Sequence, residues 1–234
     1  MKKKIKKSGF DNNLTNYGDI EFSSYLRRSF AKSMGYTDES LNKPIVGIIN
    51  TSSGFNSCHR HFPEMIDALK RGINSNGCLP VEFPVISLGE VYLHPTSMMF
   101  RNLMSMDVEE MIRAQPLDAV VLLGGCDKTL PAMIMGAISA QKPFVVLPAG
   151  PMITSKFENN RLGACTDCRR YWSNYREGKI SRHKISEVEN KLASSAGTCS
   201  VMGTASTMAC ISEVMGLCLT CLLYTSDAAD DRLS

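Results

Sequence analysis

The sequence lacks most of the features that define membrane, secreted or repetitive proteins. Its longest apolar runs, at 119–123 and 144–149, are far shorter than the roughly 20 residues of a membrane-spanning helix. Residues 1–7 are basic, but no apolar segment follows them, so they do not form a secretory signal. Beyond this lysine-rich start we find no internal repeat or low-complexity segment. We therefore expect a cytoplasmic protein without a membrane partner.

The sequence also has little excess charge. Its 26 Lys and Arg residues against 23 Asp and Glu give a formal net charge of +3. Five of the lysines lie within residues 2–7, and without them the acidic residues outnumber the basic ones. The basic character therefore belongs to a solvated N-terminal tail, predicted over residues 1–20. A nucleic-acid groove is not implied, and nucleic acid is not an expected partner.

Cysteine is present, but not in a pattern typical of disulfides. The count of nine is odd, and a chain of 234 residues without a secretory signal does not need a disulfide framework. Three of the cysteines, Cys58, Cys126 and Cys199, lie in segments rich in small or polar residues. They are roughly 70 residues apart, so no local zinc-finger spacing joins them. They form one site only if their loops meet in the fold; otherwise they are separate thiols.

Short apolar runs alternate with segments of helical periodicity. Strands are predicted at 44–49, 81–86, 119–123 and 144–147, and helices at 22–34, 65–73 and 131–140. Capping-box spacing further predicts helix starts at Asp107 and Ser186. Continuous apolar strands that alternate with helices indicate a mostly parallel sheet covered on both faces, a three-layer α/β/α sandwich.

The carboxyl ends of the predicted strands are the expected place for a site. Loops gather there in parallel sheets, and the segments with Cys58 and Cys126 both follow predicted strands. Three thiolates leave one position of a metal or iron–sulfur centre open, which a Lewis-acid catalyst needs.

Asp127 and Lys128 follow Cys126 directly. A carboxylate beside a soft thiolate suggests two adjacent centres, one for iron–sulfur and one for Mg²⁺, with Glu90 as a second candidate oxygen ligand. The alternatives are a helix N-cap for Asp127, a solvated loop acid for Glu90 and a surface lysine for Lys128. A helix N-terminus disfavours a cation, so Lys128 is a candidate for a modified or paired amine.

Two further features are less specific. Cys165 and Cys168 have a CxxC spacing, but a single pair is more typical of ordinary loop thiols than of a zinc or redox site. His59 and His61 flank the Cys58 segment. Either histidine could hydrogen-bond a substrate or have a structural role.

Three segments resemble the dihydroxy-acid and sugar-acid dehydratase family, the IlvD/Edd type. They are NSCHRHF at 56–62, GCDKTLPAMIMGA at 125–137 and GTCSVMGTASTM at 197–208. The resemblance covers roughly residues 20–219. Leu130 and Ser206 stand where the family often has Thr and Asn, and neither is a presumed ligand.

The resemblance implies a cofactor set and a reaction. Cys58, Cys126 and Cys199 would hold an iron–sulfur cluster, either [2Fe–2S] or [4Fe–4S]. Glu90, Asp127 and a carbamylated Lys128 would hold Mg²⁺. The implied enzyme is a hydro-lyase that converts a 2,3-dihydroxy carboxylic acid, either a sugar acid or a branched-chain acid, to the 2-keto acid. The segments around Glu90 and at 106–110 and 162–170 look closer to the sugar-acid branch, and the family suggests a homodimer.

The resemblance also implies that part of the protein is missing. Family chains are much longer, with a β-rich C-terminal domain that supplies a serine base and another metal ligand. We expect an incomplete cluster-binding α/β domain over 21–219, a non-native or truncated tail over 220–234, and no activity of this chain alone. The alternatives are an inactive fragment, an iron–sulfur electron carrier or sensor with Cys165 or Cys168 as fourth ligand, and a metal-free α/β binding module.

Overall fold

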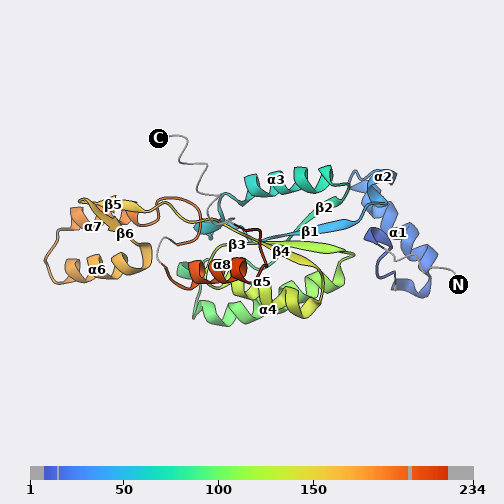
Figure 1. Cartoon of the computed structure of the whole chain (residues 1–234). Helices are drawn as coiled ribbons and strands as arrows, with labels where there is room; N and C mark the ends of the chain where they lie inside the picture. Colours follow the sequence, from blue (N-terminus) through green and yellow to red (C-terminus); the bar gives the residue numbers. More distant parts are fainter. Residues whose placement is uncertain (1–7, 15, 200–201, 221–234) are drawn as a thin grey trace.

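Four short apolar segments form one parallel sheet at the centre of the molecule (Figure 1). They are β1 (Ile45–Asn50), β2 (Leu79–Pro84), β3 (Ala119–Gly124) and β4 (Phe144–Pro148), in the order β2-β1-β3-β4. The structure is a computed structural model that describes residues 8–14, 16–199 and 202–220. The lysine-rich residues 1–7, and residues 221–234 of the predicted non-native tail, lie outside this range.

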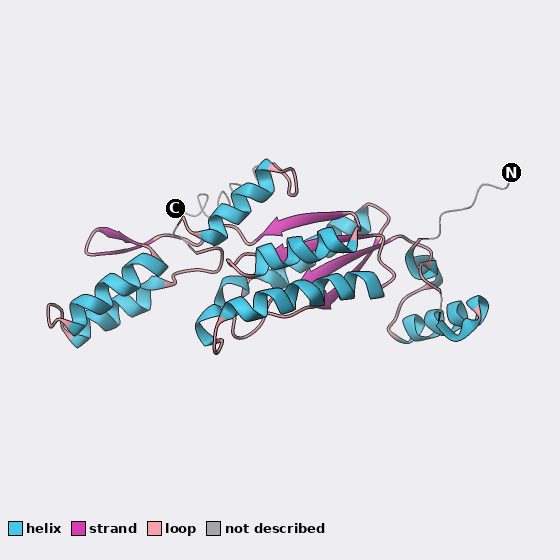
Figure 2. Cartoon of the chain, turned by 90° about the horizontal axis from the view of Figure 1, so that it is seen from below, coloured by secondary structure: helices cyan, strands magenta, loops and turns pink. Residues whose placement is uncertain are grey.

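Helices cover both faces of the sheet, which confirms the predicted three-layer α/β/α architecture. One face carries α3 (Phe62–Ser75), and the other carries α4 (Ser97–Ala114), α5 (Thr129–Ala140) and α8 (Thr204–Val214), seen from below in Figure 2. No helix in the described part of the chain is both long enough and apolar enough to cross a membrane.

The two layers of core follow from the alternation of side chains along the strands. In β1, Ile48 packs toward Phe62 and Ile66 of α3, whereas its neighbour Ile49 joins the core under α4 and α5. The residues of β3 divide in the same way, with Leu123 on the α3 side. Successive side chains of a strand point to opposite faces, so a continuous apolar run supplies both cores at once.

The strand order reverses between β1 and β3. From β1 the chain crosses by α3 to β2 on one side, and from β3 it crosses by α5 to β4 on the other side. The loops that leave β1 and β3 therefore diverge to opposite faces and open a crevice between them. Such a topological switch point is where open parallel sheets bind ligands.

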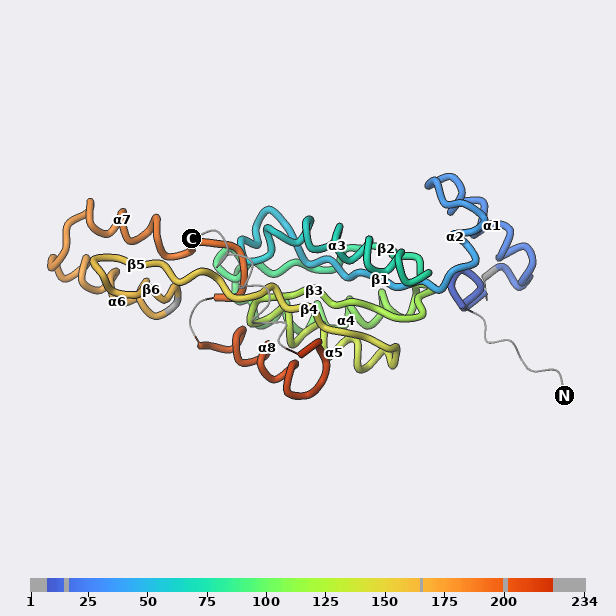
Figure 3. Tube along the Cα trace, turned by 45° about the horizontal axis from the view of Figure 1, so that its top comes forward, coloured from blue at the N-terminus to red at the C-terminus, as the bar shows by residue number. Residues whose placement is uncertain are grey.

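Two smaller units lie at opposite ends of the sheet (Figure 3). One consists of β5 (Ser155–Phe157), β6 (Asn160–Leu162), α6 (Ala164–Arg176) and α7 (Arg182–Leu192), with its own core around Phe157 and Tyr171. The other contains the 3₁₀ helices η1 (Gly9–Asp11) and η2 (Asn16–Gly18), then α1 (Ile20–Ser33) and α2 (Asp38–Leu41). The Asp118 carboxylate accepts hydrogen bonds from the Gly9 and Ile45 amides, at 2.7 and 2.8 Å. Part of the predicted N-terminal tail is thus tied to the sheet.

Both capping-box predictions are wrong. Asp107 lies inside α4, which begins after Thr96, and its carboxylate accepts a hydrogen bond from the Ile86 amide at 2.8 Å. Ser186 lies inside α7, whose N-cap is Ser181. The capping-box spacing alone does not locate a helix start. Asp107 has this spacing inside a helix, where its carboxylate makes a tertiary contact instead. The second strand runs over 79–84, two residues earlier than predicted.

Gly136 allows α4 and α5 to approach closely. A Cβ atom at this position would lie 2.6 Å from the Ser105 carbonyl oxygen, so the two helices would have to separate. We expect Gly136→Ala to lower the free energy of unfolding by about 1–3 kcal/mol, measured by urea denaturation. The matched control is Gly72→Ala in α3, where a Cβ meets nothing within 4 Å, and which should be stabilising by up to about 1 kcal/mol. Equal stability of Gly136→Ala and the wild type would contradict the packing argument.

Candidate functional site

Three loops that are far apart in the sequence form one cavity of about 250 Å³ at the carboxyl end of the sheet. Cys58 lies in the 3₁₀ helix η3 (Ser57–His59) after β1, Cys126 lies between β3 and α5, and Cys199 precedes α8. All three side chains line the cavity together with Glu90 and Asp127. Five of the six residues predicted from the sequence therefore meet in one place.

His59 joins the Cys58 loop to the Cys126 loop. The ring is fully buried, and its Nε2 atom accepts a hydrogen bond from the Gly125 amide at 2.9 Å. Because Nε2 accepts, the ring proton is on Nδ1, which lies 3.1 Å from the Thr51 carbonyl oxygen and donates to it. The Thr51 hydroxyl continues the connection by donating to the Leu123 carbonyl at 2.8 Å. His59 therefore has the structural role rather than that of a substrate ligand.

The Cys199 loop is attached through its backbone. The Gly197 amide donates to the Cys58 carbonyl at 2.9 Å, and the Thr198 amide donates to the Gly150 carbonyl at 2.6 Å. His61 supports the same region, since its Nε2 atom donates to the Ala149 carbonyl at 2.9 Å. The Cys58 loop is thus bonded to both other cysteine loops.

The cavity disfavours free thiolates. Burial, together with the neighbouring Cys126 and Cys199, raises the pKa of the Cys58 thiol to about 11. Burial also raises the pKa of Cys126, although hydrogen bonds from Thr129 and Lys128 oppose the increase. These two thiols are therefore protonated at neutral pH until a positively charged group enters the cavity. Binding of such a group must release protons.

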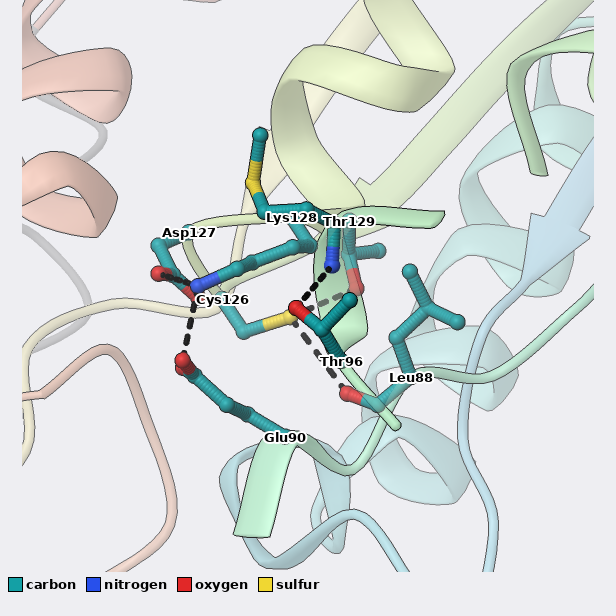
Figure 4. Close-up of polar contacts among 8 residues, drawn as sticks. Leu88, Glu90, Thr96, Cys126, Asp127, Lys128 and Thr129 are labelled. Carbon is teal, nitrogen blue, oxygen red and sulfur yellow. Dashed lines mark hydrogen bonds and ion pairs between the residues drawn. The ribbon is translucent and has the colours of Figure 1, made fainter. Parts of the chain in front are cut away.

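Oxygen atoms from two different elements lie close to the Cys126 sulfur, as Figure 4 shows. The Thr129 hydroxyl oxygen lies 2.6 Å away, and the Leu88 carbonyl oxygen lies 3.7 Å away. While the thiol is protonated, either the thiol or the Thr129 hydroxyl can be the donor. Once the thiol proton is lost, only the hydroxyl can donate to the sulfur.

Lys128 holds two carboxylates together at the edge of the cavity (Figure 4). Its Nζ atom lies 2.7 Å from Glu90 Oε1 and 2.5 Å from Asp127 Oδ2. The lysine side chain is only 12% exposed. Burial lowers the pKa of Lys128, but the hydrogen bonds to Asp127 and Glu90 outweigh it, so that the pKa is raised overall. The Lys128 ammonium group thus occupies the position between Glu90 and Asp127 at which a metal cation could contact both carboxylates.

Gly89 sets the position of Glu90. A Cβ atom on this residue would lie 2.0 Å from the Phe55 carbonyl oxygen, so only glycine allows the two loops to touch. Glu90 opens the 3₁₀ helix η4 (Glu90–Tyr92) directly after this contact. Its side chain is about half exposed, yet it pairs with Lys128, so it is more than a solvated loop acid.

The donor atoms fit two different kinds of metal group. In the described residues, no group of three His, Cys, Asp or Glu side chains could hold a metal ion. The three thiols surround a cavity rather than a point, which suits a cluster whose iron atoms take separate cysteine ligands. Glu90 and Asp127 supply two oxygen donors, and Mg²⁺ is usually bound by one or two carboxylates together with water.

The structure decides between several alternatives left open by the sequence. Asp127 is not a helix N-cap, because α5 begins after Lys128 and its first turn has no side-chain cap. Lys128 is a buried ion-paired amine, not a surface lysine. Cys165 and Cys168 lie in α6, not in a loop, and Cys168 lines a separate groove beside Trp172.

Sequence reasoning missed Thr129 and the apolar wall of the cavity. Thr129 had a weak signal, since position i+3 from Cys126 at a helix start faces back toward the residue that precedes the helix. The wall residues Leu88, Met152, Ala164 and Ala193 come from four separate segments. No local pattern marks them, because only the fold brings them to the cavity.

Comparison with known proteins gives a consistent result. The family model for the N-terminal part of dihydroxy-acid/6-phosphogluconate dehydratases matches residues 43–232. This match extends past residue 219, where the predicted domain ends, and the predicted domain boundaries stay predictions.

Curated relatives match most of this chain. L-arabonate dehydratase of Azospirillum brasilense is 45% identical over 87% of the chain and 35% of its own length. 6-deoxy-6-sulfo-D-gluconate dehydratase of Pseudomonas putida is 43% identical over 84% of the chain and 34% of its own length. Dihydroxy-acid dehydratase of Methanococcus vannielii is 35% identical over 87% of the chain and 38% of its own length. The chain spans about a third of the length of these relatives.

His59 makes the stability of the fold depend on pH. Burial lowers its pKa to about 4, whereas an unfolded histidine titrates near 6.5. The unfolded chain therefore binds a proton that the folded chain does not, and the stabilisation present above about pH 6.5 is lost as the pH falls toward 4. Between pH 7 and 5 we expect this group to lower the free energy of unfolding by about 2 kcal/mol, measured by urea denaturation.

The control separates His59 from other titrating groups. His59→Gln should show a shallower pH dependence over this range, whereas His183→Gln, whose side chain is 85% exposed, should follow the wild type. If the free energy of unfolding of His59→Gln depends on pH as steeply as that of the wild type, His59 is not the buried neutral group that causes the dependence.

Proposed function

Because the chain belongs to the dihydroxy-acid/6-phosphogluconate dehydratase family, we propose that it is the cofactor-binding part of a hydro-lyase. The reaction removes water from a 2,3-dihydroxy carboxylic acid and gives the 2-keto acid. The observation that carries this proposal is a single cavity lined by three cysteines and two carboxylates from separate loops. Homodimer formation and a cytoplasmic location stay predictions.

We favour a sugar acid as the substrate. The relatives named for L-arabonate and 6-deoxy-6-sulfo-D-gluconate are more similar to this chain than the relative named dihydroxy-acid dehydratase. A branched-chain dihydroxy acid is the alternative. Both substrates share the carboxylate and the adjacent hydroxyl groups, so the part of the cavity that would bind these groups serves either.

Cys58, Cys126 and Cys199 would hold an iron–sulfur cluster, either [2Fe–2S] or [4Fe–4S]. Three protein ligands leave a coordination position open, as a Lewis-acid role requires. An electron carrier would need a fourth protein ligand. Among the cysteines whose side chains are described, only these three line the cavity, and Cys168 lies at another groove. The hydro-lyase is therefore the better supported of the two functions.

Glu90, Asp127 and a carbamylated Lys128 would hold Mg²⁺. The two carboxylates are already held together by the Lys128 ammonium group. Carbamylation would replace this positive charge by a negative one and would leave three acidic groups that need a cation. Modification of Lys128 and binding of Mg²⁺ should therefore occur together.

When bound, the cluster would supply a Lewis-acidic iron for the leaving hydroxyl, and Mg²⁺ a hard cation for the substrate carboxylate and its neighbouring hydroxyl. The chain itself contributes the ligands and a largely apolar wall that includes Leu88 and Met152. Such a wall excludes water and strengthens the electrostatic interactions of bound oxygens. The remaining lining side chains with a hydroxyl are Ser57, Tyr92 and Thr204, and we assign none of them as the base.

Loading with iron and sulfide tests this proposal. After anaerobic reconstitution we expect the wild type to contain both elements and to show cluster absorption. Cys58→Ser, Cys126→Ser and Cys199→Ser should each lose most of this absorption, because a cluster with two protein ligands is poorly held. Addition of L-arabonate should perturb the absorption more strongly than a branched-chain dihydroxy acid does.

The control for thiol loss in general is Cys78→Ser. Cys78 directly precedes β2, at the amino end of that strand, and does not line the cavity, so this variant should load like the wild type. A wild-type protein without iron and sulfide, or equal loading of Cys78→Ser and Cys126→Ser, would count against the proposed function.

A further inference from the structure

Thr129 is buried against the sulfur of Cys126. Its side chain is fully inaccessible to solvent, and its hydroxyl oxygen lies 2.6 Å from Cys126 Sγ (Figure 4). The Leu88 carbonyl oxygen lies 3.7 Å from the sulfur as an acceptor for the thiol, and either atom of the Cys126–Thr129 pair can donate while the thiol is protonated. When the thiol loses its proton, the sulfur becomes an acceptor only, and the same hydroxyl bond becomes charge-assisted.

Packing fixes the orientation of this hydroxyl. A Cβ atom added to Gly124 would lie 3.2 Å from the Thr129 γ-methyl group, which shows that the methyl lies against the end of β3. With the methyl held there, rotation about χ1 would drive it out of its packed position. The hydroxyl is therefore aimed at Cys126 before any ligand binds.

The donor to Cys126 differs from the donor to Cys58. The Cys58 sulfur accepts a hydrogen bond from the side chain of Ser57, which is exposed to solvent. Water can replace an exposed hydroxyl, but it cannot readily replace one that is buried and fixed. Loss of the Thr129 hydroxyl should therefore remove a donor that water does not replace, and leave Cys126 with the backbone amides of Lys128 and Thr129.

We propose that Thr129 is a positioning residue that holds the Cys126 thiolate for iron and sets the properties of the cluster through one hydrogen bond. The inference rests on the proposed function, because it requires Cys126 to be a cluster ligand. A donor to a ligand sulfur stabilises the additional negative charge of the reduced cluster, so it raises the reduction potential. The same bond also holds the sulfur in the geometry that binds iron.

The test compares two variants of Thr129 in the full chain after anaerobic loading. Thr129→Val keeps the shape and removes the donor, whereas Thr129→Ser keeps the donor and removes the methyl. We expect the midpoint potential of Thr129→Val to shift to a more negative value, and its iron to be lost to a chelator about 10-fold to 150-fold faster, the factor for one charge-assisted hydrogen bond. Thr129→Ser should stay close to the wild type in both measurements.

Thr198 provides the matched control. It is also a buried threonine, next to Cys199, but its hydroxyl makes no hydrogen bond within the described part of the chain. Thr198→Val should therefore leave the potential and the rate of iron loss unchanged. Urea denaturation of all three variants before loading shows whether a change in potential or in iron loss comes from a less stable fold and not from the missing hydroxyl.

The outcomes distinguish this inference from the proposed function. If the wild type takes up no iron and sulfide, both fail. If the wild type loads and Thr129→Val has the same potential and rate of iron loss, only the role of Thr129 is refuted. An equal shift in Thr198→Val or in Thr129→Ser would likewise refute it, because the effect would not follow the hydroxyl that contacts Cys126.

Discussion

The hydrogen bond from the Gly125 amide to the His59 ring is the contact on which the rest of the site depends. It crosses the crevice between β1 and β3 and joins the loops that carry Cys58 and Cys126. The bond requires a neutral imidazole, which the buried surroundings of His59 enforce. Since Gly197 in turn donates to the Cys58 carbonyl, the third cysteine loop takes its position from the same place.

These hydrogen bonds between the cysteine loops explain how an uncharged protein interior can form a site for charged groups. The cavity wall is mostly apolar, and it raises the pKa values of Cys58 and Cys126. At its edge, one ammonium group balances two carboxylates. These side chains are therefore held in place while protonated or internally paired, as the proposed binding of cations requires.

The smaller unit formed by β5, β6, α6 and α7 also takes part in this site. Ala164 at the start of α6 and Ala193 after α7 line the cavity, so the unit closes one of its sides. The proposed substrate pocket thus combines the sheet edge with a separately packed helical unit. The family relationship extends over most of the chain, whereas activity, substrate and assembly are proposals, because the curated relatives are about three times longer than this chain.

The sequence by itself determined the layers of the fold and which side chains are the candidate donors. Apolar runs predict buried strands because both faces need apolar side chains, and Cys126, Asp127 and Lys128 are adjacent, so their proximity needs no fold. The helix starts at 97 and 182, the buried role of His59 and the contact of Thr129 with Cys126 were decided only by the tertiary structure. The physical reason is that hydrogen bonds between distant segments compete with local preferences, and their partners are brought together only when the sheet forms.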